Sequence, residues 1–372
     1  LGAPIGTSAF CSQQDGMIER VTSKAVEYVW KIGQLENPQA QYLLLHHSAR
    51  CSLSHLPRLI KPQVLSGYAL RHQQALHEGV RSVLKLQQFS DFQRTRISLP
   101  LREGGIGIVS AYDTLVTGWV AAHGDISRWL KKSVWKEAGI FLAMMPDATG
   151  LRGSVSELNE ILVRHEQTVR IKPLDPLLPW TWPKSKDLSK VTHRVAADDL
   201  EQELILESKP GNKIALSWFR SCRLHGAMDW LRTIPRFHTF RVSPALWRVM
   251  FATTMCAPVV SSMMNLICPC GNDSQLLRYG IHWYAQCNTV TLKTTRHNVV
   301  ADVLRQLFKA AGWITIDGEA ANWVPGRKDK RPFDVCAKQK LSDPWTAIDL
   351  AVMDPTRVGK IPTGQYAFKP GQ

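Results

Sequence analysis

The chain has 372 residues, 44% of them hydrophobic, and its 46 lysines and arginines outnumber 31 aspartates and glutamates to give a formal net charge of +15. This composition predicts a globular, soluble and intracellular protein of about two to three structural units; long disorder, a signal peptide and a membrane span of about 18 apolar residues are excluded. The charge favours a nucleic-acid partner, although a basic surface without a partner stays open.

Helices are expected throughout the N-terminal part. A helical period begins at Asp15 with one apolar face, made by Ile18, Val21, Ala25 and Val29. Asn37 before Pro38 is typical of a helix start, because asparagine accepts free backbone donors and proline has none to lose. Further helices are expected around 66–90 and 110–145, and the paired glycines of SLPLREGGIGI predict a turn between them.

Four prolines and two tryptophans in residues 171–185 exclude a regular helix there. This segment is expected to be a linker or an extended packing arm, and we place a boundary in it. A polar helix is expected near 187–207, and Ser243 before Pro244 predicts another helix that runs to about Cys256. The last part of the chain changes to short strands and turns around one strong helix.

A cluster of cysteine and histidine stands out among the eight scattered cysteines. Its candidate ligands are Cys268, Cys270, His282 and Cys287. Three thiolates and one imidazole form a usual tetrahedral set for structural zinc, although one residue between the first two cysteines is a tight spacing. Two alternatives stay open. The cysteines can be buried thiols beside a hydrogen-bonded histidine, with no zinc, or Cys256 can replace one of the four ligands.

Residues 296–311 form the strongest predicted helix, and Gly312 supplies its stop. Its apolar stripe consists of Val299, Val300, Val303, Leu304, Leu307 and Phe308. A strand that leads to Glu319 follows, and then a basic loop with Arg327, Lys328, Lys330 and Arg331. Residues 333–337, which alternate as a half-buried strand, and 346–352 are expected to pair as neighbouring strands.

These two strands carry Asp334 and Asp349, which are expected to lie on the same face. Adjacent carboxylates bind a divalent cation, and magnesium prefers such oxygen ligands and positions water for attack on a phosphodiester. We therefore predict Asp334 and Asp349 as magnesium ligands and Glu319 as a weaker third, with the basic loop on the DNA backbone. The alternative is that both aspartates are strand-end residues in ordinary hydrogen bonds.

The order of these pieces resembles the C-terminal part of site-specific non-LTR retrotransposon polyproteins. The resemblance is carried by a CPCG start, an HxxxxC end, RHNVVADVLRQLFKAAGW, RPFDV and AIDLAVMDP, and in the N-terminal half by LGAPIGTSAF, NPQAQYLLLHHSARCSLSHLPRLI and LPLREGGIGI. It implies a multi-domain α+β protein with a mainly α-helical N-terminal thumb and linker, a small CCHC zinc knuckle and a C-terminal α/β restriction-endonuclease-like domain of the PD-(D/E)XK class. The implied domains are 1–125 (reverse transcriptase palm exit and thumb), 126–242 (linker), 243–295 (helix and knuckle) and 296–372 (endonuclease, truncated).

The family resemblance also implies an activity, target-primed reverse transcription in the nucleus, with target DNA and element RNA as partners and zinc and magnesium as cofactors. The chain begins with Leu1, so we expect a fragment whose palm aspartates lie upstream. The sequence Ala197-Asp198-Asp199 follows the thumb and is expected to be a solvated helix face.

Departures from the family pattern leave the enzymatic activity open. Phe333 separates Pro332 from Asp334, and Ala351 stands where many such nucleases have lysine. Lys360 is the nearest candidate for that lysine. The alternative function is a catalytically inactive nucleic-acid-binding remnant with a structural zinc knuckle, and a third is a zinc-stabilised interaction protein without a nucleic-acid role.

Basic and aromatic residues before the cluster are candidates for phosphate binding and base stacking: Trp218, Arg220, Arg223, Trp230, Arg232 and Arg236. Packing of the linker is an equal alternative for them. Arg296 is a further candidate for nucleic-acid binding, and His297 beside it is expected to cap and orient the helix rather than to act as a general base.

Overall fold

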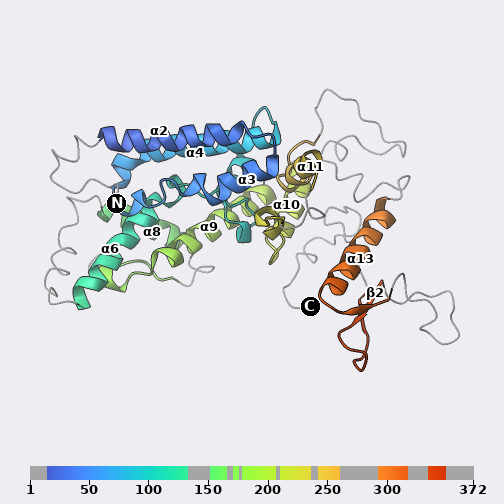
Figure 1. The fold of residues 1–372 in the computed structure, drawn as a ribbon. Coiled ribbons are helices and arrows are strands. Elements are labelled where there is room, and N and C mark those ends of the chain that lie inside the picture. Colours follow the sequence, from blue (N-terminus) through green and yellow to red (C-terminus); the bar gives the residue numbers. More distant parts are fainter. Residues whose placement is uncertain are drawn as a thin grey trace. The chain divides into compact units, whose positions relative to one another are not determined.

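The protein is mainly helical in its computed structural model, which describes residues 15–132, 151–165, 171–175, 178–206, 210–235, 242–259, 292–316 and 334–348 (Figure 1). The chain divides into two compact units, Leu1–Ala257 (unit 1) and Pro258–Gln372 (unit 2). Within the described ranges, no helix is both long enough and apolar enough for a membrane span.

Unit 1 consists of helices. Its α-helices are α2 (Asp15–Gly33), α3 (Pro38–His47), α4 (Pro62–Leu84), α5 (Asp91–Ser98), α6 (Leu115–Lys132), α8 (Leu151–Arg164), α9 (Ser185–Leu206), α10 (Pro210–Cys222) and α11 (Pro244–Thr254). Its short 3-10 helices are η1 (Ala49–Cys51), η2 (Leu56–Arg58), η3 (Leu101–Glu103), η4 (Tyr112–Thr114), η6 (Pro179–Thr181) and η7 (Asp229–Arg232). Helix α2 packs along α4, and α3 also contacts α4 (Figure 1).

The predicted helix starts are confirmed. The side chain of Asn37 accepts a hydrogen bond from the backbone N–H of Ala40 (3.0 Å) at the beginning of α3, and Ser243 does the same for Leu246 (3.3 Å) at α11. Helix α2 begins at Asp15. On its predicted apolar face, Ile18, Ala25 and Val29 are buried.

The predicted helix over 66–90 is wrong at both ends. Helix α4 already begins at Pro62, and it ends at Leu84 because Lys85 takes a left-handed conformation (φ 55°). A new helix, α5, then starts from a capping box in which Ser90 and Gln93 exchange hydrogen bonds. Helices α5, α8 and α10 were not predicted.

The glycine-rich turn packs against α5 through backbone hydrogen bonds. Ile106 N–H donates to the carbonyl of Arg96 (3.0 Å), and Gly107 N–H donates to that of Leu99 (2.8 Å). The Arg96 guanidinium is completely buried, and its N–H groups donate to the carbonyls of Gly104 (2.7 Å) and Thr254 (2.5 Å). One buried cation thus joins this turn to the end of α11.

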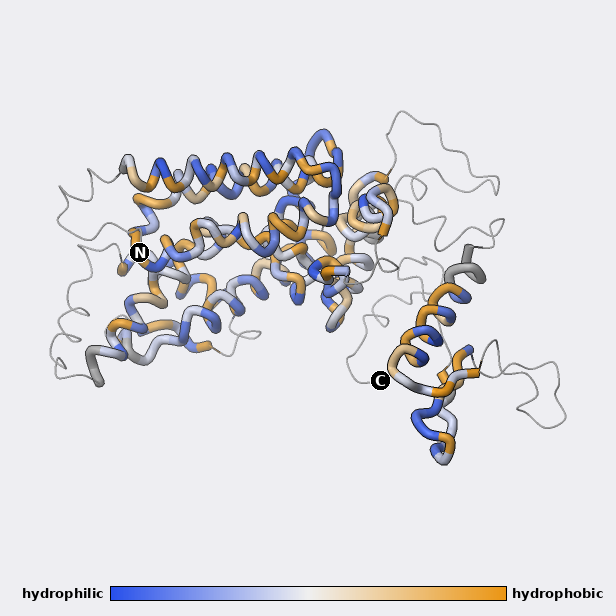
Figure 2. Tube along the Cα trace, in the orientation of Figure 1, coloured by the Kyte–Doolittle hydropathy of each residue, from blue (hydrophilic) through white to orange (hydrophobic). Residues whose placement is uncertain are grey.

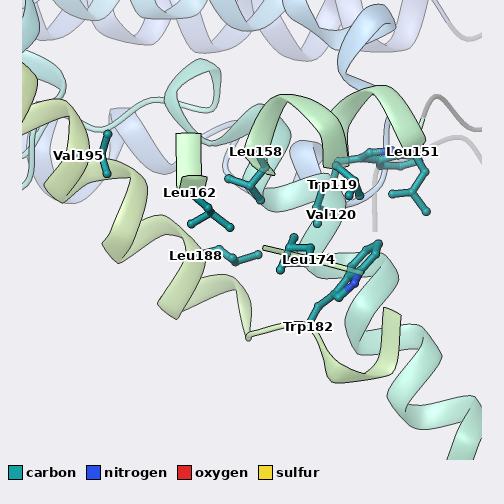
Figure 3. Close-up of a cluster of buried hydrophobic side chains, with 11 residues drawn as sticks. Trp119, Val120, Leu151, Leu158, Leu162, Leu174, Trp182, Leu188 and Val195 are labelled. Atoms are coloured by element: carbon teal, nitrogen blue, oxygen red, sulfur yellow. The ribbon is translucent and has the colours of Figure 1, made fainter. Parts of the chain in front are cut away.

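The proline-rich segment after α8 is a packing arm rather than a free linker. Leu174 and Trp182 are buried in a core that α6, α8 and α9 share (Figure 3). Asn159 on α8 fixes the arm, because its side chain accepts from the N–H of Leu174 (2.6 Å) and donates to the carbonyl of the same residue (2.9 Å). Unit 1 therefore continues through the boundary segment of the sequence.

Unit 2 contains one helix, α13 (Leu292–Ala310), and a three-stranded antiparallel sheet among its described residues. The strands are β1 (Ile314–Thr315), β2 (Val335–Lys338) and β3 (Thr346–Ile348), in the order β1-β2-β3. Helix α13 contacts both β1 and β2. It ends where predicted, since Gly312 follows it with a φ of 80°.

Two expectations about burial in unit 2 are corrected by the structure. Strand β2 does not alternate, because Val335, Cys336 and Ala337 are all at most 2% exposed in the middle of the sheet. The predicted apolar stripe of α13 is largely exposed, as at Val299 (55%) and Leu307 (48%). Figure 2 shows hydrophobic and hydrophilic residues alternating along this helix.

Candidate metal and nucleic-acid sites

Asp334 lies directly before β2, the central strand of the sheet. Its N–H donates to the carbonyl of Ile348 (3.0 Å), and its own carbonyl accepts from the Arg305 guanidinium (2.8 Å). Its carboxylate is 14% exposed, and Oδ2 lies 3.1 Å from Nε2 of His297. Asp334 is therefore positioned by the neighbouring strand and by two residues of α13.

The predicted pairing of the two acid-bearing strands is confirmed. Strands β2 and β3 are antiparallel neighbours, with Val335 opposite Ile348 and Ala337 opposite Thr346. The other predicted catalytic residues, Glu319, Asp349 and Lys360, lie outside the described residues. Among the residues that the structure describes, no three metal-binding side chains lie together.

His297 has a position that the sequence did not indicate. Helix α13 begins at Leu292, so His297 lies beyond the first turn and does not cap the helix. Its Nε2 instead faces the Asp334 carboxylate. The only signal in the sequence was a histidine near the start of an amphipathic helix, because the contact joins residues far apart in the chain.

The predicted zinc ligands Cys268, Cys270, His282 and Cys287 lie outside the described residues. Cys256, the proposed replacement, follows α11 in unit 1, and desolvation raises the pKa of its thiol to about 12. Zinc binds the thiolate form, which this environment disfavours.

Arg223, a predicted nucleic-acid-binding residue, is held by carboxylates of α9. Its guanidinium donates to Asp198 (2.6 Å) and Glu201 (2.7 Å), and Arg220 donates to the same Glu201 (2.7 Å). The Arg223 side chain is only 19% exposed. These contacts favour the packing role for both arginines.

Arg232 is more accessible than Arg223. Its side chain is 56% exposed, and it pairs with Asp229 (2.9 Å) within η7. Exposed pairs of this kind contribute little to stability, so the guanidinium can exchange its partner for a phosphate. The remaining predicted phosphate contacts are outside the described side chains: Arg236, Arg296, Arg327, Lys328, Lys330 and Arg331.

The Ala197-Asp198-Asp199 sequence lies within α9. Ala197 is fully buried, Asp198 pairs with Arg223, and Asp199 lies 3.3 Å from Nε2 of His165. The expectation of a solvated face is therefore wrong for Ala197, whereas Asp198 is part exposed and Asp199 is exposed. Both carboxylates have partners within unit 1.

Trp230 also has a packing role. Its ring meets Trp247 edge to face at 6.1 Å, and Trp247 in turn lies against Tyr42 at 5.8 Å. Trp247 is 1% exposed. Trp230 therefore belongs to an aromatic group that joins η7 to α3 and α11.

No protein-family model matches the chain, and no match was found among curated proteins or solved structures.

Proposed function

We propose that this chain is a part of a site-specific non-LTR retrotransposon polyprotein and that unit 2 contains a magnesium-dependent endonuclease that nicks target DNA for target-primed reverse transcription. The observation that supports the proposal most is the position of Asp334. It directly precedes Val335, the first residue of β2, which pairs with Ile348 of β3. Because Asp334 N–H donates to Ile348, the residue opposite Val335, the ladder shifts by one residue here, and Asp349 follows Ile348 directly in the sequence. In the proposal, Asp349 supplies a second carboxylate next to that of Asp334.

Two neighbouring carboxylates would suit a hard divalent cation, because magnesium prefers oxygen ligands. The bound ion would activate a water and stabilise the charge on the cleaved phosphodiester. In the proposal, the basic loop with Lys328 and Arg331 holds the DNA backbone, and Arg232 is a further phosphate contact. In the proposal, unit 1 contains the thumb and linker.

Nicking of supercoiled plasmid tests this function. The chain with Mg²⁺ is expected to produce open circles, and Asp334→Asn or Asp349→Ala should lower the rate at least about 100-fold, because each removes a metal ligand. Asp343→Asn is the matched control. Asp343 accepts from the N–H of Lys340 (3.0 Å) in the turn between β2 and β3, and asparagine retains that acceptor.

Two results would contradict the nuclease. Nicking that survives both substitutions would trace to a contaminant, and absence of nicking in a folded chain would leave the DNA-binding remnant. That alternative still predicts DNA affinity that falls steeply with salt, since neutralised phosphates release counterions. Weak binding insensitive to salt would favour the zinc-stabilised interaction protein.

The knuckle is the second part of the proposal, with structural zinc on Cys268, Cys270, His282 and Cys287. Protein purified without chelators is expected to contain about one equivalent of zinc by elemental analysis, and Cys268→Ser should remove most of it. Cys51→Ser is the control, because Cys51 is an exposed thiol of unit 1. Less than about half an equivalent in the unmodified chain would exclude this site.

A further inference from the structure

In the described part of unit 2, the side chains of His297 and Asp334 lie in contact, and each carries an atom that could bind a metal ion. Nε2 and Oδ2 are 3.1 Å apart, and the two side chains are 27% and 14% exposed. Both are thus largely shielded, yet each keeps an accessible part.

The backbone on both sides of this contact is held in place. Helix α13 packs on β1 and β2, and Arg305, two turns after His297, donates to the Asp334 carbonyl (2.8 Å). The Arg305 side chain is 13% exposed and also pairs with Asp302. His297 lies on the helix and Asp334 directly before the strand that this helix contacts, an arrangement that suits a preorganised ligand pair.

Their separation is that of two neighbouring ligands of one metal ion. Metal bonds of about 2.1 Å at a right angle place two donor atoms about 3.0 Å apart. On the other side of the ring, Nδ1 of His297 lies 3.3 Å from Oδ1 of Asn298. Without a metal the Asp334 carboxylate favours a proton on Nε2; a bound metal would displace that proton, and Nδ1–H would then donate toward Asn298.

We infer that His297 is a nitrogen ligand of the divalent metal held by Asp334, so that this site binds Mn²⁺ more tightly than Mg²⁺. The inference rests on the proposed nuclease, and it replaces an all-oxygen site by a mixed one. Imidazole favours transition metals, while magnesium prefers oxygen donors and keeps several waters. Manganese accepts both kinds of donor.

Electron paramagnetic resonance of Mn²⁺ added to the full chain tests the ligand directly. The bound ion should show echo modulation from a nitrogen nucleus, and His297→Ala should abolish it and weaken Mn²⁺ binding about tenfold or more. Mg²⁺ binding should change less. His225→Ala is the control, because His225 lies on an exposed turn of unit 1.

A second variant, His297→Gln, retains a polar side chain of similar length and serves if alanine destabilises the helix. Equal Mn²⁺ affinity and unchanged nitrogen modulation in both variants would overturn the inference. If Asp334→Asn then still removes metal binding and nicking, the proposed nuclease survives with oxygen ligands alone. If Asp334→Asn affects neither, the nuclease itself is wrong and the ligand role of His297 fails with it.

Discussion

Lowering the pH from about 7 to about 5 is expected to remove several kcal/mol of folding free energy from unit 1, because neutral histidines are buried in it. Burial lowers the pKa of His46 to about 3 and those of His72 and His193 to about 4. The three residues are at most 9% exposed. In the unfolded chain the pKa of histidine is about 6.5.

The unfolded chain therefore binds more protons than the folded one between pH 6.5 and about 4, so acid stabilises the unfolded state. Each histidine accounts for about 2 kcal/mol between pH 7 and 5. Three such groups approach the whole stability of an ordinary domain, about 5–15 kcal/mol. Stability should be fully regained above pH 6.5.

Hydrogen exchange measured peptide by peptide against pH assigns this loss to unit 1. His193→Leu should reduce the pH dependence, because it removes an ionisable group whose ring nitrogens have no hydrogen-bond partner in the described part of the chain. His55→Ala, at an exposed position, should leave it unchanged. Equal protection of the unit 1 amides from exchange at pH 7 and pH 5 would show that protonation of the buried histidines is not coupled to unfolding.

Gly105→Ala is expected to destabilise unit 1 by about 3 kcal/mol or more, the upper end for overpacking. A Cβ atom at Gly105 would lie 2.0 Å from the carbonyl oxygen of Leu99 and 2.4 Å from its carbonyl carbon. Both are backbone atoms, and the oxygen accepts the hydrogen bond from Gly107 N–H, so no side-chain rotation relieves the clash. The turn has to move away from α5, which also disturbs the carbonyl of Gly104 that binds Arg96.

Urea unfolding of the full chain measures this effect, and Gly67→Ala is its matched control. Gly67 is an exposed position inside α4 where an added Cβ meets nothing within 4 Å. Alanine there should stabilise the helix by about 0.5–1 kcal/mol. An unchanged urea midpoint for Gly105→Ala would contradict the close approach of Gly105 to Leu99.

Much of the secondary structure was predictable because its signals are local. Asn37 and Ser243 begin helices by bonding to residues three positions ahead, and Gly312 ends one through its own backbone conformation. The pairing of the two acid-bearing strands also followed from the sequence. The predicted helix over 66–90 is wrong, since α4 begins at Pro62 and ends at Leu84, before the left-handed Lys85.

The candidate site was predictable only in part. The sequence predicted that the strand next to Asp334 pairs with the following strand, because only a short turn connects the two. Its contact with His297 was not predictable, because it depends on how α13 packs on the sheet. Likewise, the sequence predicts Arg223 as a phosphate ligand, whereas its carboxylate partners on α9 favour a packing role.

The amino-acid order by itself thus determined where α2, α3 and α11 begin and that the acid-bearing strands are neighbours, since caps, turns and periodicity act within a few residues. Only the tertiary structure decided that the proline-rich segment is a packing arm, that Arg223 is neutralised and that His297 faces Asp334. Each of these depends on which surfaces meet. Burial and pairing are properties of distant residues brought together, and no local pattern encodes them.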